Sequence, residues 1–355
     1  MCSAAPFSIC FPPDIEPPLM ESHPHPDDTI IAPGLRAFMQ RIVDYAGMFP
    51  PADLRLTDAM ERFLSYRGEP ERWMLNRFVI PTRRLEELRP FRQAIAHNPP
   101  VGFSVLGTGG ATPEAFLEAF TADLDRIDQC VEDHSSRVRP DVMEVRLPAS
   151  LLDTPELPAI RDFLAAVDAH LARHGLAHLD IFFEVPLTDQ TTARLPKLLS
   201  TFADANADQP VPERSVIGLK IRCGGMEAGL FPSVEHVATA IAACRNASVR
   251  FKATAGLHHP ARHYDDDLEV MRHGFFNVFG AAVFALQHDL DADGIAAILR
   301  EENEETFTFT QEGMQWGPLS ASVEDISYAR STLAHSFGSC SFEEPVDDLR
   351  ALGLM

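Results

Sequence analysis

The chain has 355 residues, a hydrophobic content of 45% and a formal net charge of −22 at pH 7. This charge argues against nucleic acids and anionic membrane surfaces as partners, because binding to either requires a basic surface. The length and the hydrophobic content are those of a globular protein with one large domain or two ordinary ones.

The six cysteines are widely spaced and form no Cys-x-x-Cys pair, which argues against a disulfide framework and a zinc ribbon. The first residues lack the basic and apolar regions of a signal peptide. No run approaches the roughly 18 apolar residues of a membrane span. We therefore expect a cytoplasmic protein.

Residues 1–32 are rich in proline and show no apolar periodicity, which predicts a disordered tail. In residues 33–302, short apolar runs alternate with amphipathic helical stretches, the pattern of parallel βα units. The predicted strands are residues 41–45, 75–80, 101–106, 142–147, 179–185, 216–222, 249–254 and 275–279.

Helix starts are predicted at Thr112, Thr154 and Ser233, each a capping residue ahead of an apolar stripe. Eight strands alternating with helices predict a (β/α)8 barrel of the TIM type, and an open doubly wound sheet is the alternative. Residues 303–355 follow the eighth predicted helix. They predict a C-terminal extension, with a hairpin from Thr306 to Trp316, a helix over 322–337 and a short last helix.

Several charged and polar side chains should point into this barrel, because alternate strand residues face inward. Such charges must pair with each other or hold a charged ligand. An excess of two positive charges, counted as Arg146, Lys220, Arg222 and Lys252 against Glu144 and Glu184, predicts a small anionic substrate. The inward set is Asp44, Arg77, Glu144, Arg146, Glu184, Lys220, Arg222, Arg250, Lys252, Thr254 and Asn277.

Only three of the 30 basic residues are lysines, and Lys220 and Lys252 occupy matching places in strands 6 and 7. A lysine amine can form an imine with a carbonyl, whereas an arginine cannot. Two neighbouring ammonium groups repel, so we expect the pKa of one to fall. The other interpretation of both lysines is structural, as salt bridges from Lys220 to Glu184 and from Lys252 to Glu144.

This lysine pair resembles that of the class I aldolases of the deoxyribose-phosphate aldolase type. The resemblance covers strands 6 and 7 and implies that Lys220 is the Schiff-base residue and Lys252 the lysine that perturbs it. The segment that follows Lys220 is Ile-Arg-Cys-Gly-Gly, where those enzymes have small hydroxyl-bearing residues.

Three other segments are similar to a family of uncharacterised bacterial proteins, and this similarity runs over most of the chain. It implies no activity. The segments are Val43-Asp-Tyr-Ala-Gly-Met-Phe-Pro-Pro51, Lys252-Ala-Thr-Ala-Gly-Leu-His-His-Pro260 and Phe337-Gly-Ser-Cys-Ser-Phe-Glu-Glu-Pro345.

The loop after strand 7 contains His258 and His259, which are candidate proton-transfer groups. Together with His263, Glu144 or Glu184 they are also candidate metal ligands. The alternative for each histidine is a hydrogen bond to the backbone.

Gly224 and Gly225 after strand 6 are candidate phosphate-binding turns. Cys223 and Cys340 are candidate nucleophiles or inert buried thiols.

We therefore predict a barrel enzyme that acts on a small anionic carbonyl compound, as a carbon–carbon lyase or an isomerase. The predicted catalytic residues are Lys220, Lys252, Glu184, His258 and His259. No cofactor is required by this chemistry. The alternatives are a metal-dependent enolising or hydrolytic barrel that uses Glu144, Glu184 and the histidines, and a ligand-binding barrel without catalysis. A homo-oligomer is compatible with each of them.

Overall fold

The computed structural model describes residues 31–153, 157–207 and 215–355, which belong to one compact unit that begins at Ile31. The predicted disordered tail lies outside the described residues up to residue 30, as does the predicted helix start at Thr154. No helix in the described part of the chain is long and apolar enough to cross a membrane.

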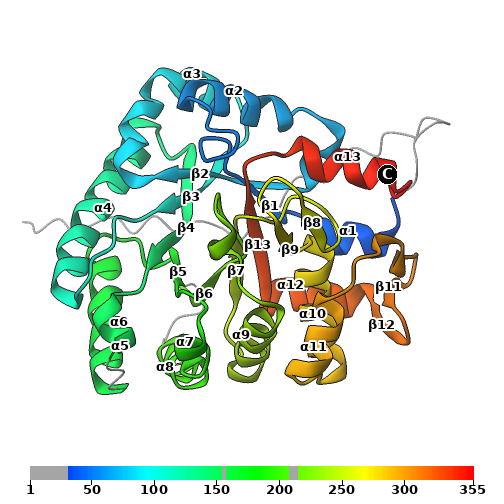
Figure 1. Cartoon of the computed structure of the whole chain (residues 1–355). Coiled ribbons are helices and arrows are strands. Elements are labelled where there is room, and N and C mark those ends of the chain that lie inside the picture. The colour runs from blue at the N-terminus through cyan, green and yellow to red at the C-terminus, as the bar shows by residue number, and fades with distance from the viewer. Residues whose placement is uncertain (1–30, 154–156, 208–214) are drawn as a thin grey trace, which may run out of the picture. The chain divides into compact units, whose positions relative to one another are not determined.

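Eight parallel strands close into a barrel in the order β1-β13-β7-β6-β5-β4-β3-β2 (Figure 1). The closed ring confirms the predicted (β/α)8 barrel and excludes the open sheet. The barrel strands are β1 (Val43–Tyr45), β2 (Leu75–Pro81), β3 (Val101–Leu106), β4 (Val138–Arg146), β5 (Asp180–Glu184), β6 (Ile217–Arg222), β7 (Phe251–Thr254) and β13 (Ala334–Ser339).

Helices surround this ring, and two of the predicted helix starts are confirmed. The Thr112 hydroxyl accepts a hydrogen bond from the Ala115 amide at the start of α4, and Ser233 accepts one from the His236 amide at the start of α9. The α-helices are α1 (Pro33–Met39), α2 (Leu56–Tyr66), α3 (Arg92–Ala96), α4 (Pro113–Asp133), α5 (Ala149–Asp153), α6 (Leu157–Arg173), α7 (Asp189–Thr192), α8 (Leu195–Ala207), α9 (Val234–Ala247), α10 (Phe275–His288), α11 (Ala292–Leu299), α12 (Val323–Thr332) and α13 (Glu343–Ala351).

Four 3₁₀ helices and two small antiparallel sheets complete the described elements. The 3₁₀ helices are η1 (Pro70–Trp73), η2 (Thr82–Phe91), η3 (Ala228–Leu230) and η4 (Glu304–Thr306). One sheet pairs β8 (His263–Asp265) with β9 (Val270–Arg272), and the other contains β10 (Phe307–Phe309), β11 (Gly313–Trp316) and β12 (Leu319–Ser322). The predicted hairpin is confirmed, because Phe307 of β10 pairs with Trp316 of β11.

The predicted eighth strand, residues 275–279, is wrong, because these residues begin α10. Eleven consecutive residues of this helix, from Phe275 to Ala285, are buried. A helix that is buried on all sides and a buried strand both give a continuous apolar run, so periodicity cannot separate them.

The strand that closes the barrel is β13, which pairs with β1 on one side and β7 on the other. It lies inside the segment 303–355 that was expected to be an extension, and the helix predicted over 322–337 ends at Thr332. The division at residue 302 therefore cuts through the barrel. The sequence does not predict this strand, because the small and polar residues of Ala-His-Ser-Phe-Gly-Ser have little strand propensity.

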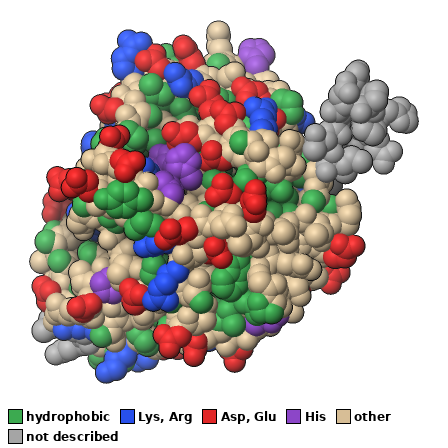
Figure 2. Space-filling view, turned by 45° about the vertical axis from the view of Figure 1, so that its right-hand side comes forward, with side chains coloured by type: hydrophobic (Ala, Val, Ile, Leu, Met, Phe, Trp, Pro, Cys, Tyr) green, Lys and Arg blue, Asp and Glu red, His purple; other side chains and the backbone are tan. Residues whose placement is uncertain are grey.

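The strand register places the inward residues of neighbouring strands at the same height. Glu184 pairs with Lys220, which in turn pairs with Lys252. One step further along the strands, Arg222 pairs with Thr254 and Thr254 with Gly338. Acidic side chains spread over the surface, as Figure 2 shows for one face, while Lys220 and Lys252 are buried.

Candidate active site

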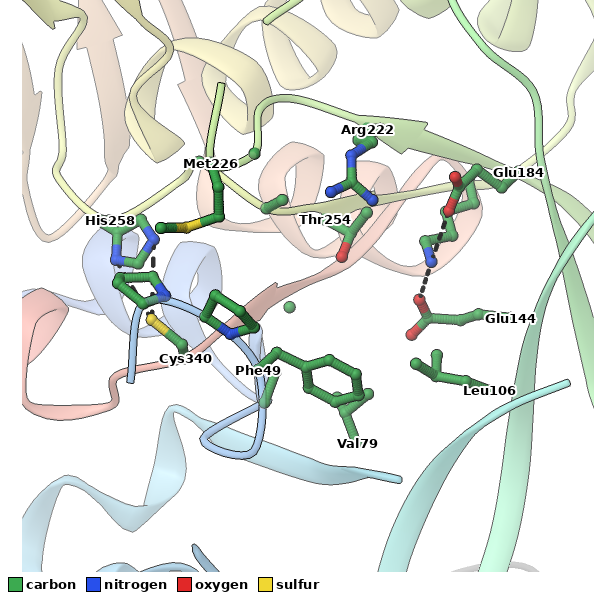
Figure 3. Close-up of a pocket in the computed structure, with 18 of the residues that line it drawn as sticks. Phe49, Val79, Leu106, Glu144, Glu184, Arg222, Met226, Thr254, His258 and Cys340 are labelled. Atoms are coloured by element: carbon green, nitrogen blue, oxygen red, sulfur yellow. Dashed lines mark hydrogen bonds and ion pairs between the residues drawn. The ribbon is translucent and has the colours of Figure 1, made fainter. Parts of the chain in front are cut away.

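A cavity of about 680 Å³ opens at the carboxyl ends of the barrel strands. Its walls are the strand ends and the loops that follow them, which is where barrel enzymes carry their active sites. Figure 3 shows Glu144 and Glu184 on one side of the cavity and His258 with Cys340 on the other.

Glu144 lies at the centre of a buried chain of alternating charges. Its Oε1 is 2.9 Å from Lys252 Nζ, and its Oε2 is 2.9 Å from Lys220 Nζ. The Ser104 hydroxyl donates a third hydrogen bond to Oε1 at 2.6 Å. Burial favours the neutral acid, but the two ammonium groups outweigh it and hold the pKa of Glu144 far below its usual range.

Lys252 lies below the cavity and is fully buried. Its ammonium group binds Glu144 on one side and the Asp44 carboxylate of β1 on the other. Asp44 also accepts hydrogen bonds from the Ser336 hydroxyl at 2.7 Å and from the Arg77 amide at 3.2 Å. Lys252 is not among the residues that line the cavity.

Lys220 lines the cavity and keeps 9% of its side chain exposed. Its Nζ lies 2.9 Å from Glu144 Oε2 and 2.9 Å from Glu184 Oε2. Burial lowers the pKa of Lys220, but the two carboxylates more than offset this, so its pKa is raised above the ordinary value. The expected fall does not occur at Lys220, because Glu144 lies between the two lysines and neutralises their repulsion.

Glu184 joins this chain to the rim of the cavity. Burial would raise the pKa of Glu184, but Lys220, with Arg222 and Arg146, holds it below the usual value. Arg146 approaches Glu184 Oε1 at 3.5 Å, and its side chain is 79% exposed at the mouth of the cavity. Both salt bridges of the structural interpretation are therefore formed, in a larger network that reaches the cavity.

Arg222 and Thr254 lie beside this network at the ends of β6 and β7 (Figure 3). The buried Nε of Arg222 has no hydrogen-bond partner among the described residues. The neighbouring Gly338 of β13 brings no side chain, and a Cβ there would lie 3.2 Å from the Thr254 hydroxyl. The Arg222 guanidinium and the Thr254 hydroxyl therefore line a part of the cavity wall where Gly338 leaves space for a ligand.

The two histidines after β7 point to different partners. His258 lines the cavity, and its Nδ1 lies 2.7 Å from Glu344 Oε2 of α13. His259 lies outside the lining, and its Nδ1 is 2.8 Å from Asp348 Oδ2 of the same helix. The structure therefore brings only His258 to the candidate site.

Asn277 belongs to α10 rather than to a strand and lies outside the cavity lining. It accepts a hydrogen bond from the Arg262 amide and donates to the carbonyls of Ile298 and Glu301, which ties a loop to two helices. Gly225 lines the cavity. Gly224 does not, and a Cβ there would meet the Phe231 ring at 2.5 Å, so its close packing explains the glycine.

Among residues 31–153, 157–207 and 215–355, no group of three or more His, Cys, Asp or Glu side chains could hold a metal ion. The oxygens of Glu144 and Glu184 that were candidate ligands face Lys220 instead. No observation on the described residues therefore favours the metal-dependent alternative.

Sequence reasoning did not predict the roles of Ser104, Ser336 and Glu344. The two serines hold the carboxylates of the network, but a serine in a strand gives no signal of its partner. Glu344 is 86 residues away from the His258 that it contacts. Only the alternation of inward positions on β3 and β13 could have pointed to the serines.

No protein-family model and no curated protein matches the chain. Among solved structures, one described as "QR15, an Aldolase" is similar, with a TM-score of 0.38 and 10% sequence identity over 61% of this chain and 80% of that one. A similarity of this size carries no argument about chemistry. The barrel is established by its own strand order.

Proposed function

We propose that the protein is an enzyme that forms an imine between Lys220 and the carbonyl group of a small anionic substrate, as a carbon–carbon lyase or an isomerase. The observation that supports this is the position of Lys220. It lines the cavity at the carboxyl end of the barrel, and its Nζ lies 2.9 Å from two carboxylates.

Lys220 is a better candidate than Lys252 because a substrate in the cavity can reach it. Lys252 is fully buried, and both of its carboxylate partners belong to the barrel interior. In this proposal Lys252 keeps Glu144 ionised and fixed in place. It is therefore a positioning residue.

The charges around Lys220 suit an imine as well as an ammonium group. Glu184 takes one proton from the ammonium, and the free amine then adds to the carbonyl carbon to give a carbinolamine. The carbinolamine loses its oxygen as water, with the proton returned by Glu184. The protonated imine carries the same single positive charge as the ammonium, so Glu144 and Glu184 keep their partner throughout.

The raised pKa of Lys220 means that the first proton transfer costs free energy in the empty site. Substrate binding can supply that energy. Arg222 and Arg146 stabilise Glu184 as a carboxylate, and a substrate anion bound to these arginines offsets their positive charge. Glu184 then accepts the proton more readily. Arg222, with Thr254 beside it, is therefore the proposed anion-binding group.

Reductive trapping tests this proposal. We expect sodium borohydride with pyruvate, glyoxylate or a phosphorylated hydroxyaldehyde to add a stable mass to the peptide that contains Lys220. Lys220→Arg keeps the positive charge but cannot form the imine, so the adduct should disappear. Lys197→Arg is the matched control, because Lys197 is exposed on α8 and its loss should leave the adduct unchanged.

Two results would contradict the proposal. The first is the absence of an adduct with every carbonyl compound of the panel, and the second is an adduct that persists in Lys220→Arg. Calorimetric binding of the same compounds without any adduct would instead support a ligand-binding barrel. The anion-binding role of Arg222 is tested separately, by comparing a neutral aldehyde with the anionic compounds. If both kinds of compound give the same amount of adduct, in the wild type and in Arg222→Gln, only the anion-binding role is overturned.

A further inference from the structure

Cys340 and His258 line the side of the cavity opposite Glu144 and Glu184 (Figure 3), and Glu344 of a third element contacts His258. Cys340 follows β13, His258 follows β7, and Glu344 lies in the first turn of α13. Glu344 Oε2 is 2.7 Å from His258 Nδ1, and Cys340 Sγ is 4.0 Å from both ring nitrogens of His258.

This arrangement orients and charges the imidazole. Glu344 accepts the Nδ1 proton, which leaves Nε2 to donate toward the thiol or a bound molecule. Burial lowers the pKa of His258, but Cys340 and Glu344 outweigh it and raise the pKa to about 9. The ring is therefore a cation at neutral pH, and its Nε2 proton is available to an oxyanion that forms next to Cys340.

Cys340 is 8% exposed and differs from the other described cysteines in its contact with the cavity. Cys340 lines the cavity. Cys223 and Cys244 are fully buried and Cys130 nearly so, and burial raises the pKa of the Cys130 and Cys223 thiols to about 12. A buried thiol with a raised pKa is inert.

We propose that Cys340, with His258 as its proton donor and Glu344 as the group that orients His258, is a second reactive site of this cavity, which takes small aldehydes as thiohemiacetals. The thiolate sulfur adds to the aldehyde carbon, the π bond of the carbonyl breaks, and His258 gives its Nε2 proton to the oxygen. One S–C bond and one O–H bond form, no redox partner is needed, and the imidazole becomes neutral.

This site uses no atom of Lys220 or of its carboxylate partners, so it does not depend on the proposed imine chemistry. Cys340 and His258 lie across the cavity from Glu144 and Glu184 (Figure 3). His258, His259 and Arg272 of β9 are the charged groups that lower the pKa of Glu344.

The test is alkylation by limiting iodoacetamide at pH 7, followed by peptide mapping of every cysteine. We expect Cys340 to react at least about tenfold faster than Cys130, Cys223 and Cys244, because the thiolate is the reacting form. His258→Gln and the milder Glu344→Gln should both slow Cys340, and Cys130→Ser should not change its rate. Equal rates for Cys340 and Cys223, or an unchanged Cys340 rate in both the His258 and Glu344 variants, would overturn the proposal.

A second arm tests the aldehyde. Acetaldehyde or glyceraldehyde should protect Cys340 from iodoacetamide to the same extent in the wild type and in Lys220→Arg. Lack of protection in the wild type would overturn the thiohemiacetal. Protection that disappears in Lys220→Arg would also overturn it, because the aldehyde would then be held by Lys220.

Discussion

Five charged side chains inside the barrel each have an opposite charge on both sides, and this explains how they can be buried. Asp44, Lys252, Glu144, Lys220 and Glu184 follow one another as acid, base, acid, base and acid. Removing one of these buried charges leaves two buried neighbours without a partner and lowers the free energy of unfolding. Removing an exposed charge changes that free energy very little. The two kinds of lysine in this chain allow a direct comparison.

We expect Lys252→Met to lower the free energy of unfolding by about 3–5 kcal/mol, because Asp44 and Glu144 lose their shared cation in a buried site. Urea denaturation followed by circular dichroism measures this change. Lys197→Met is the control, and since Lys197 is exposed, its effect should stay within about 0.5 kcal/mol. Equal stability of the two variants would show that the buried network does not stabilise the fold.

At the scale of elements, the barrel closes through its least apolar strand. β13 turns Ser336 and Gly338 toward the interior, where Ser336 binds Asp44 and Gly338 lines the cavity. Phe337 points the other way, against α10, and its ring lies 5.6 Å from the Phe275 ring and 5.7 Å from the Phe279 ring. One aromatic side chain therefore packs this strand against α10.

Phe337→Ala should destabilise the protein by about 3–5 kcal/mol, because it leaves a cavity between β13 and α10. The measurement is thermal or urea unfolding. Tyr328→Ala, on the neighbouring α12 and 62% exposed, should change the free energy of unfolding by less than about 0.5 kcal/mol. A Phe337 variant as stable as the Tyr328 variant would contradict the role of β13 in closing the barrel.

At the scale of the whole molecule, different ionisable groups contribute to the pH dependence of stability in different parts of the pH range. The pKa values of Glu144 and Glu184 are lowered on folding, so their contribution to stability is complete above about pH 4.3 and lost only in acid. The pKa of Lys220 is raised, so its contribution persists up to its ordinary value near 10.4. His258 titrates between these limits, because its own pKa is raised to about 9.

The free energy of unfolding should fall as pH rises from 7 to 9. The folded state keeps a proton on His258 that the unfolded state loses near pH 6.5, and each unit of the difference is worth about 1.4 kcal/mol. We expect a loss of up to about 3 kcal/mol, measured by urea denaturation at each pH. His258→Gln should flatten the curve over this interval, and a wild-type curve that is flat or rising from pH 7 to 9 would contradict the raised pKa.

The sequence by itself determined the alternation of strands and helices and the inward direction of the charged residues. Seven of the eight predicted strands coincide with barrel strands, because the apolar period of a βα unit is local to each segment. The inward direction of Glu144, Lys220 and Lys252 follows from the same local alternation.

Only the tertiary structure decided which strand closes the ring, how deep each lysine lies and which groups meet across it. The apolar sequence of α10 predicts a strand, and the polar sequence of β13 predicts a loop. The strand that closes the barrel is therefore identified only by its pairing with β1 and β7. Lys220 and Lys252 share one register, yet only Lys220 lines the cavity. The raised pKa of Lys220 and the contact of His258 with Glu344 arise between residues far apart in the chain, and electrostatic energies depend on distance in space.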